Sequence, residues 1–245
     1  MPINFHFWRP FLKRALLTLA LMSSSGLSAV AGGVRITNHG HSSLLIKGGG
    51  QSVLLNPFKA VACATGLKEP RLRANVILAS SELADEGARV AQGVFLVKPG
   101  SYRINGLQIE GFTAPHDRFG GRRYGLATLW QWTQAGLRFA HLGGAAAPLT
   151  EEDKVLLGRP DVLFIAVGGG AKTYDGLEAA MVVRDLKPKR VIPVQYVRGT
   201  PSRDCDQFGI QPFLDAMKGT EVRKVSKTLF LRKELSNQTV INIMR

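Results

Sequence analysis

Cysteine, histidine and acidic residues are all scarce in this sequence. Its 245 residues include two cysteines and five histidines, and 18 Asp and Glu stand against 32 Lys and Arg. Two thiols are too few for a disulfide-rich scaffold or a four-thiolate zinc site. The chain has no run of 20 apolar residues, which excludes a polytopic membrane protein. With 45% hydrophobic and 20% charged residues it can bury a core, so wholesale disorder, a coiled coil and collagen are also excluded.

The first 31 residues have the layout of a secretory signal peptide. Three basic residues and no acid occur among the first 14, the short apolar run 15–22 (ALLTLALM) follows, and Ala29–Ala31 supplies small residues before Gly32. We therefore predict a signal peptide over residues 1–31, cleaved after Ala31, with an uncleaved anchor as the alternative. Residues 32–245 would then form a single exported domain, in the periplasm or, if the host is photosynthetic, in the thylakoid lumen.

Export changes what the two cysteines can do. In an oxidising compartment Cys63 and Cys205 can form a disulfide, which would close a long loop and stabilise the fold by about 4–5 kcal/mol in the chain-entropy model. The alternative is two buried, unpaired thiols.

The periodicity of the chain changes in its second half. Short β-rich segments separated by turns come first, over residues 34–37, 42–47, 52–55, 75–79, 95–98, 107–114, 124–132 and 137–142. A buried strand (161–167), a helix (177–186) with Asp175 as N-cap, a second buried strand (190–194) and a second helix (207–218) follow. A meander followed by alternating β and α predicts two packed sheets with helices outside them.

Polar residues follow several of these strands, where functional loops collect in such sheets. The loops are NHGH (38–41), NPF (56–58), SSELADE (80–86), PHDR (115–118), HLGG (141–144), GGG (168–170) and QY (195–196).

Three stretches give the sequence a family resemblance: NHGHSSLLIKGGGQSVLLNPF, LRFAHLGGAAA and DVLFIAVGGGAKTYDGLEAAMVVRDLKPKRVIPVQY. The sequence resembles the metallo-β-lactamase superfamily, most closely its small, lactonase-type metallo-hydrolase-like branch, over roughly residues 34–215. The resemblance implies an α/β fold, a four-layer αββα sandwich. It also implies a dinuclear metal cleft at the sheet edges, usually with zinc, that hydrolyses esters, lactones, phosphodiesters or β-lactams.

Most metal-ligand positions of that family carry other residues here. The family motif Thr-His-x-His-x-Asp-His aligns with residues 80–86, the next histidine with His116, the bridging carboxylate with Gly144 and the last histidine with Gln195. The seven positions therefore hold Ser81, Leu83, Asp85, Glu86, His116, Gly144 and Gln195. Only Asp85 and His116 match, with Glu86 as a substitute oxygen donor.

Catalytic zinc needs three protein ligands and an open position, which the matched residues do not supply. We expect no resident cofactor, or zinc at low occupancy on a weak residual site made by Asp85 and His116. Without a metal there is no bound water of lowered pKa to act as nucleophile. If the chain is nevertheless catalytic, His116, Asp85 and Glu86 are the candidate residues.

Basic residues recur on the same loops, namely Lys59, Arg118, Arg122, Arg123, Lys172, Arg198 and Arg203. They predict an anion-attracting cleft whose ligand-binding candidates are His41, Asn56, Arg118, Arg122, Arg123, Gln195 and Tyr196. The alternative is a cationic surface that keeps the protein soluble or near an anionic membrane. No nucleic acid is expected, because aromatics are not interleaved with the basic residues as stacking platforms require.

Several candidates have a structural alternative. Asp85 could cap a following helix, and His116 with Asp117 could be a base and its orienter or only a hydrogen-bonded loop. His141 is expected to hydrogen-bond behind the site, with a relocated metal ligand as the alternative. The glycines 168–170 serve either close packing or an anion.

Two hypotheses about function follow. The first is a degenerate, non-catalytic member of the family that binds an anionic small molecule or a protein partner. The second is a metal-dependent hydrolase with a rearranged or mononuclear site.

Overall fold

The computed structural model describes residues 1–2 and 32–245. The signal peptide predicted over residues 1–31 and its cleavage site at Ala31 therefore lie almost entirely outside the described residues. Within the described part of the chain, no helix is long and apolar enough to cross a membrane.

The first sheet has six strands in the order β13-β1-β2-β3-β4-β5. They are β1 (Gly33–Asn38), β2 (Leu44–Gly48), β3 (Gln51–Leu55), β4 (Arg73–Leu78), β5 (Gln92–Leu96) and β13 (Thr228–Arg232). Strands β1, β2 and β3 are antiparallel, as the predicted meander requires, because tight turns join them. Strands β3, β4 and β5 are parallel, so their carboxyl ends meet at one edge of the sheet.

The second sheet has eight strands in the order β12-β14-β11-β10-β9-β8-β7-β6. They are β6 (Gly100–Ile104), β7 (Leu107–Pro115), β8 (Leu126–Gln134), β9 (Leu137–His141), β10 (Val162–Ala166), β11 (Arg190–Val194), β12 (Glu221–Val225) and β14 (Val240–Met244). Asn105 and Gly106 form the β6–β7 turn with φ of 48° and 83°, as an Asn-Gly hairpin requires. Every residue of β10 and β11 is buried, which explains why both read as continuous apolar runs.

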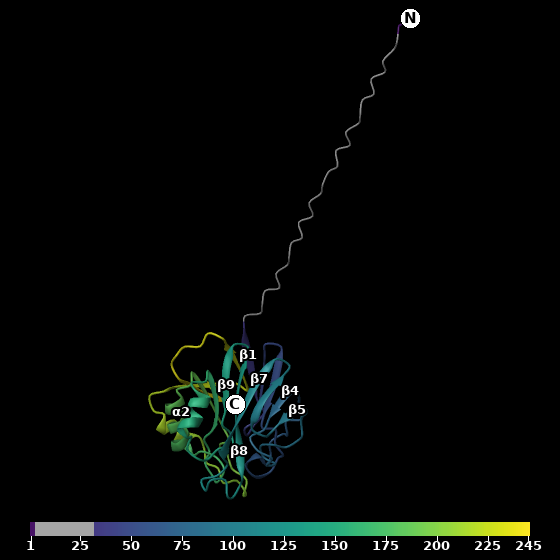
Figure 1. The fold of residues 1–245 in the computed structure, drawn as a ribbon. Coiled ribbons are helices and arrows are strands. Elements are labelled where there is room, and N and C mark those ends of the chain that lie inside the picture. The colour runs from purple at the N-terminus through teal and green to yellow at the C-terminus, as the bar shows by residue number, and fades with distance from the viewer. Residues whose placement is uncertain (3–31) are drawn as a thin grey trace. The chain divides into compact units, whose positions relative to one another are not determined.

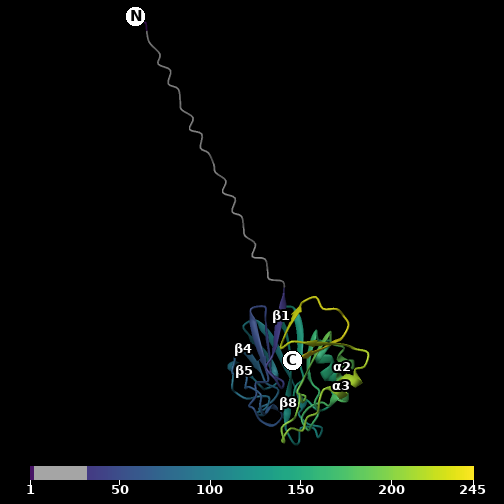
Figure 2. The same ribbon diagram turned by 180° about the vertical axis from the view of Figure 1, so that it is seen from behind.

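The two sheets pack face to face and the helices lie on one outer face (Figures 1 and 2). The core between the sheets contains stacked aromatics, with the rings of Trp132 and Phe139 5.0 Å apart. Helices α1 (Glu151–Leu157), α2 (Gly176–Leu186) and α3 (Gln211–Ala216) each bury one apolar face against the eight-stranded sheet. This confirms the predicted α/β sandwich.

The layers that cover the outer faces of the two sheets are built differently. The cluster on the other face of the six-stranded sheet consists of Leu45, Leu54, Ala74 and Ile77 with Leu72, Ala91 and Phe95 packed against them. None of these residues belongs to an α-helix, so loops supply that layer in the described chain. The 3-10 turn η1 (Ala62–Ala64) follows β3.

Helix boundaries were predicted with mixed success. Asp175 caps α2 as predicted, and its carboxylate accepts the Glu178 N–H at 2.8 Å. The helix predicted over 207–218 is shorter, because Pro212 lies in its first turn and the segment before it is extended loop. Helix α1 was missed, although Thr150 and Asp153 form a capping box that signals its start. Strands β12, β13 and β14 were also missed, since β12 and β13 are mostly exposed and show no clear apolar alternation.

Candidate functional site

The predicted site residues converge at one place. Loop 80–86 follows β4, His116 follows β7, the Gly143-Gly144 turn follows β9, and Gln195 follows β11. We call this place, where the seven family ligand positions meet, the former active face. His41, Asn56 and Gln195 adopt positive φ there, at 50°, 37° and 49°. Backbone strain of this kind is typical of functional sites.

A buried ion pair occupies the centre of the former active face. The Nε2 atom of His116 lies 2.6 Å from Oε1 of Glu86, and the two side chains are 0% and 1% exposed. The contact is close enough for an ion pair, although the ring N–H direction falls outside hydrogen-bond geometry. Burial raises the pKa of Glu86, but the charges of His116 and Lys172 and the close polar contacts of His116 and Ser81 together outweigh burial and hold that pKa at about 2. Burial lowers the pKa of His116, but Glu86 outweighs it and leaves that pKa raised.

Two further side chains surround the Glu86 carboxylate. The Ser81 hydroxyl donates to Oε1 at 2.8 Å, and the Gln195 amide donates to Oε2 at 3.4 Å. Both residues stand at positions where the family has histidine. They hold Glu86 in place as a hydrogen-bond acceptor, so the Ser81 hydroxyl donates its hydrogen bond to a weakly basic carboxylate and not to a histidine.

The Glu86 carboxylate fills the space of a missing side chain. A Cβ atom added at Gly144 would lie 2.9 Å from Oε2 of Glu86 and 3.0 Å from the Ser80 Cβ, closer than packing allows. Gly144 also has φ of 85°, which disfavours any other residue. Position 144 is where the family carries its bridging carboxylate, so Glu86 supplies a carboxylate to the same space from a different loop.

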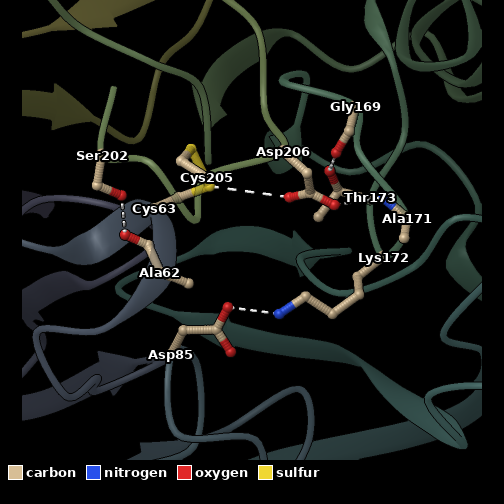
Figure 3. The surroundings of a disulfide bond; sticks show 10 residues. All are labelled: Ala62, Cys63, Asp85, Gly169, Ala171, Lys172, Thr173, Ser202, Cys205 and Asp206. Atoms are coloured by element: carbon tan, nitrogen blue, oxygen red, sulfur yellow. Dashed lines mark hydrogen bonds and ion pairs between the residues drawn. A yellow bond between two sulfur atoms is a disulfide. The ribbon is translucent and has the colours of Figure 1, made fainter. Parts of the chain in front are cut away.

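A second ion pair lies beside the first. Lys172, on the loop after β10, places Nζ 2.5 Å from Oδ2 of Asp85, with side chains 18% and 8% exposed (Figure 3). Burial lowers the pKa of Lys172, but Asp85, Glu86 and Asp206 together outweigh burial and leave that pKa raised, so the ammonium stays charged. The prediction that Asp85 caps a helix is wrong, because no helix follows it and its carboxylate is bound by Lys172.

A neutral hydrogen-bond network lies behind these pairs. Asn56 donates to the Ser80 hydroxyl at 2.9 Å and accepts the Ser80 N–H at 2.8 Å. Nε2 of His141 lies 3.3 Å from the same hydroxyl, and burial lowers the pKa of His141 to about 4, so the ring is neutral at physiological pH. The structure therefore places His141 behind the site, as predicted, and Asn56 anchors loop 80–86.

The three arginines predicted to bind a ligand are placed differently. Arg118 uses all of its nitrogens: it binds Glu178 at 2.6 and 3.0 Å and the carbonyls of Gly170 and Thr173. Four of its five N–H donors are engaged within the protein, so one donor on Nη1 remains for a ligand. Arg122 is exposed and bonds the carbonyl of Phe119, and Arg123 stacks 5.0 Å above the ring of Tyr124.

The contacts of Asp117 decide between the two roles considered for it, orienting His116 or organising a hydrogen-bonded loop. Its carboxylate accepts four backbone N–H groups, from Phe119, Gly121, Arg123 and Tyr124, at 2.8–3.1 Å. These bonds lower its pKa despite burial. Asp117 is therefore the centre of a hydrogen-bonded loop rather than a residue that orients His116.

Comparison with known proteins identifies the family. A family model described as a beta-lactamase superfamily domain matches residues 35–195. The chain belongs to the β-lactamase superfamily. The comparison with curated protein sequences gives no match.

Solved structures of this superfamily share the fold. A candidate Zn-dependent hydrolase from Thermotoga maritima is 23% identical, with a TM-score of 0.67 over 86% of this chain and 100% of its own. A candidate metal-dependent hydrolase from Parabacteroides distasonis is 20% identical, with a TM-score of 0.56 over 76% and 89%. The metallo-beta-lactamase fold protein YhfI from Bacillus subtilis is 11% identical, with a TM-score of 0.54 over 86% and 96%. At these identities the likeness concerns the fold.

Because two of these solved structures are described as metal-dependent or Zn-dependent hydrolases, we asked whether the residues of this chain could bind a metal ion. Among residues 1–2 and 32–245, no group of three or more His, Cys, Asp and Glu side chains is arranged to hold a metal ion. His116 and Glu86 contact each other directly, and an ammonium group lies on Asp85 where a cation would bind. The residues present therefore do not fit a zinc ion, which needs three converging donors.

The predicted disulfide is present. Cys63, after β3, is bonded to Cys205, after β11, across a sequence separation of 142 (Figure 3). This excludes the alternative of two unpaired thiols. The bond joins the two loops that flank a cavity of about 360 Å³, lined in part by His41 and Tyr196. Of the predicted ligand-binding residues, these two border that cavity, along with His39, Lys227 and Arg245, which sequence analysis did not select.

The pH dependence of stability should reveal the Glu86–His116 pair. The lowered pKa of Glu86 stabilises the fold above the ordinary value of 4.5, and this contribution disappears as pH falls toward 2. The raised pKa of His116 stabilises the fold fully below 6.5, and this contribution disappears as pH rises through the raised value. We expect the free energy of unfolding contributed by the pair to be largest between pH 4.5 and 6.5.

Urea denaturation at a series of pH values measures this effect. The control is the double variant Glu86→Gln/His116→Gln, which has no charge at either position but retains His141. Subtracting its profile from that of the wild type should give a curve that falls on both sides of the window. Parallel profiles would contradict the assignment.

Proposed function

We propose that this superfamily member is an exported, non-catalytic protein that binds an anionic ligand or a protein partner at the former active face. The observation that carries the proposal is the buried Glu86–His116 ion pair, which takes the place of a metal centre. Glu86 and Gly144 are sterically complementary, so the replacement is a packed structure and not a site that has only lost ligands.

The chemistry of the site supports this proposal. Hydrolysis by a metal centre depends on a bound water of lowered pKa, and the donor set here does not assemble three ligands. Ser81 is no substitute nucleophile, because its hydroxyl donates to Glu86 and a carboxylate with a pKa of about 2 is a weak base. The predicted catalytic roles of His116, Asp85 and Glu86 thus give way to structural ones in this proposal.

Export is supported by two features of the chain. Residues 1–31 have the layout of a secretory signal, and Cys63 and Cys205 form a disulfide, which persists in oxidising compartments. The periplasm is the proposed location, with the thylakoid lumen in a photosynthetic host. The excess of basic residues also allows peripheral contact with an anionic membrane.

A mononuclear metal hydrolase is the competing function. It would use Asp85, Glu86, His116 and His141, and each of these is engaged elsewhere. Glu86 would have to leave His116, Asp85 would have to leave Lys172, and His141 would have to leave Ser80. Each step breaks a buried polar contact, which costs about 1–3 kcal/mol or more for charged groups.

Metal content tests the proposed function directly. We expect residues 32–245, expressed without an affinity tag and loaded with zinc, manganese and iron, to hold metal far below one ion per chain by plasma mass spectrometry. The value should not change in His116→Ala. The positive control is the variant Ser81→His/Leu83→His/Glu86→His/Gln195→His, which gives six of the seven family ligands, leaves Gly144 unchanged and should gain metal.

The opposite outcome would overturn the proposal. Near-stoichiometric metal in the wild type that falls in His116→Ala, together with esterase, lactonase or phosphodiesterase activity abolished by a chelator, would establish the metal-dependent hydrolase.

A further inference from the structure

A cavity of about 360 Å³ opens beside the former active face. It lies between the β1–β2 loop, the two loops joined by the Cys63–Cys205 disulfide, and the turn between β12 and β13. We call it the basic pocket, after the polar residues that distinguish it: His39, His41, Arg198, Lys227 and Arg245. A cavity of this volume is at the lower end of the range for small-molecule sites, about 300–1,000 Å³.

All charged side chains that line the basic pocket are basic. No Asp or Glu lines it, and among the described residues Arg198 and Lys227 have no carboxylate within ion-pairing distance. Asp206, next to Cys205, does not line the basic pocket, and its carboxylate accepts the Ala171 N–H at 2.8 Å (Figure 3). Unpaired cations in a concave, partly dehydrated surface attract oxyanions.

Arg198 is held in position for such a ligand. Its guanidinium donates to the Tyr196 hydroxyl at 2.6 Å and lies 4.7 Å from the centre of the Tyr196 ring. Stacking on an aromatic face restricts the long side chain and leaves the other nitrogens available, so less conformational entropy is lost when an anion binds.

Two histidines of the basic pocket have unsatisfied atoms. The Nε2 atoms of His39 and His41 are buried, and neither has a hydrogen-bond partner among the described residues. The His41 carbonyl accepts the Gln195 N–H at 3.2 Å, which connects the basic pocket to the former active face. A buried polar atom without a partner is costly, and both of these atoms belong to residues that line the basic pocket.

Part of the wall is apolar and fits an organic body. Leu67, Val197 and Pro201 line the basic pocket together with the disulfide. An inorganic ion would leave this surface exposed to water, whereas a small aromatic or aliphatic group would cover it.

We infer that the basic pocket binds a small organic oxyanion, with its phosphate or carboxylate group on Arg198 and Lys227 and its apolar body on the Leu67 wall. The inference rests on the proposed function in one respect, that the protein binds an anion rather than hydrolyses a substrate, and it places that anion in the basic pocket beside the former active face. It also moves the ligand away from Arg118, Arg122 and Arg123.

Calorimetric titration of residues 32–245 with phenyl phosphate and with benzoate at low ionic strength tests the inference. We expect saturable binding of at least one probe and none of phenol, which has the same ring without the oxyanion. Arg198→Gln and Lys227→Gln should each weaken binding about tenfold, as expected for one charge-assisted hydrogen bond. Arg122→Gln is the matched control, because it removes one exposed positive charge outside the basic pocket and should leave affinity unchanged.

Three results would overturn the inference. The first is no saturable binding of either probe by the wild type. The second is wild-type affinity in both Arg198→Gln and Lys227→Gln, and the third is a loss of affinity in Arg122→Gln as large as in those two variants. Thermal midpoints of the variants show that each is folded, since both pocket substitutions are at the surface. The metal measurement is independent of this one. Absence of binding by a metal-free protein refutes the basic pocket alone, whereas binding that a chelator abolishes refutes the proposed function.

Discussion

Replacing His116 by alanine is expected to lower the free energy of unfolding by about 3–5 kcal/mol, because it leaves the Glu86 carboxylate buried without its charged partner. Glu86 is 1% exposed, so water cannot compensate for the loss. For a domain of this size the thermal midpoint should fall by roughly 2–4 °C for each kcal/mol. Urea denaturation near neutral pH measures the change.

The reciprocal substitution should cost less. In Glu86→Ala the remaining histidine can lose its proton and stay neutral in the core, whereas a stranded carboxylate must take up a proton at an unfavourable pH. The double variant Glu86→Ala/His116→Ala should lose less stability than the sum of the losses in the two single variants, by about 1 kcal/mol or more, because residues in contact couple energetically. Additive effects, or a wild-type midpoint that falls on chelation, would contradict the ion pair and point to a metal.

Removing the disulfide is expected to have an effect of similar size. Cys63 and Cys205 are 142 positions apart, and a closed loop of that length contributes about 4–5 kcal/mol in the chain-entropy model. We expect Cys63→Ser/Cys205→Ser to lose about this much stability and also to weaken phenyl phosphate binding, because the bond joins two walls of the basic pocket.

The wild type treated with a reductant should match the double serine variant. The control is the wild type alkylated without reduction, whose intact mass should show no modified thiol. Incorporation of alkylating reagent under those conditions would show that the bond is absent, and equal stability with and without reductant would show that it contributes nothing.

Local patterns predicted most of the fold. The buried strands at 161–167 and 190–194, the helix capped by Asp175 and the Asn105-Gly106 hairpin are all present, because short-range geometry determines these elements. Strands β12 and β13 escaped prediction because they are stabilised by pairing with distant strands, β13 with β1 and β12 with β14, rather than by their own apolar pattern.

The sequence by itself determined which residues stand at the positions matched to the family's metal ligands. Leu83 has no donor atom and Gly144 has no side chain, and these facts hold in any fold. Only the tertiary structure decided what the residues at these positions contact. Glu86 and His116 come from loops after β4 and β7, and Lys172 reaches Asp85 from the loop after β10, so no spacing along the chain relates them. The same holds for Arg118, which the chain brings against Glu178 on α2, and for the basic pocket, whose residues come from five separate segments. Contacts between loops depend on how the strands are ordered in the two sheets, and that order is a property of the packed core and not of any local pattern.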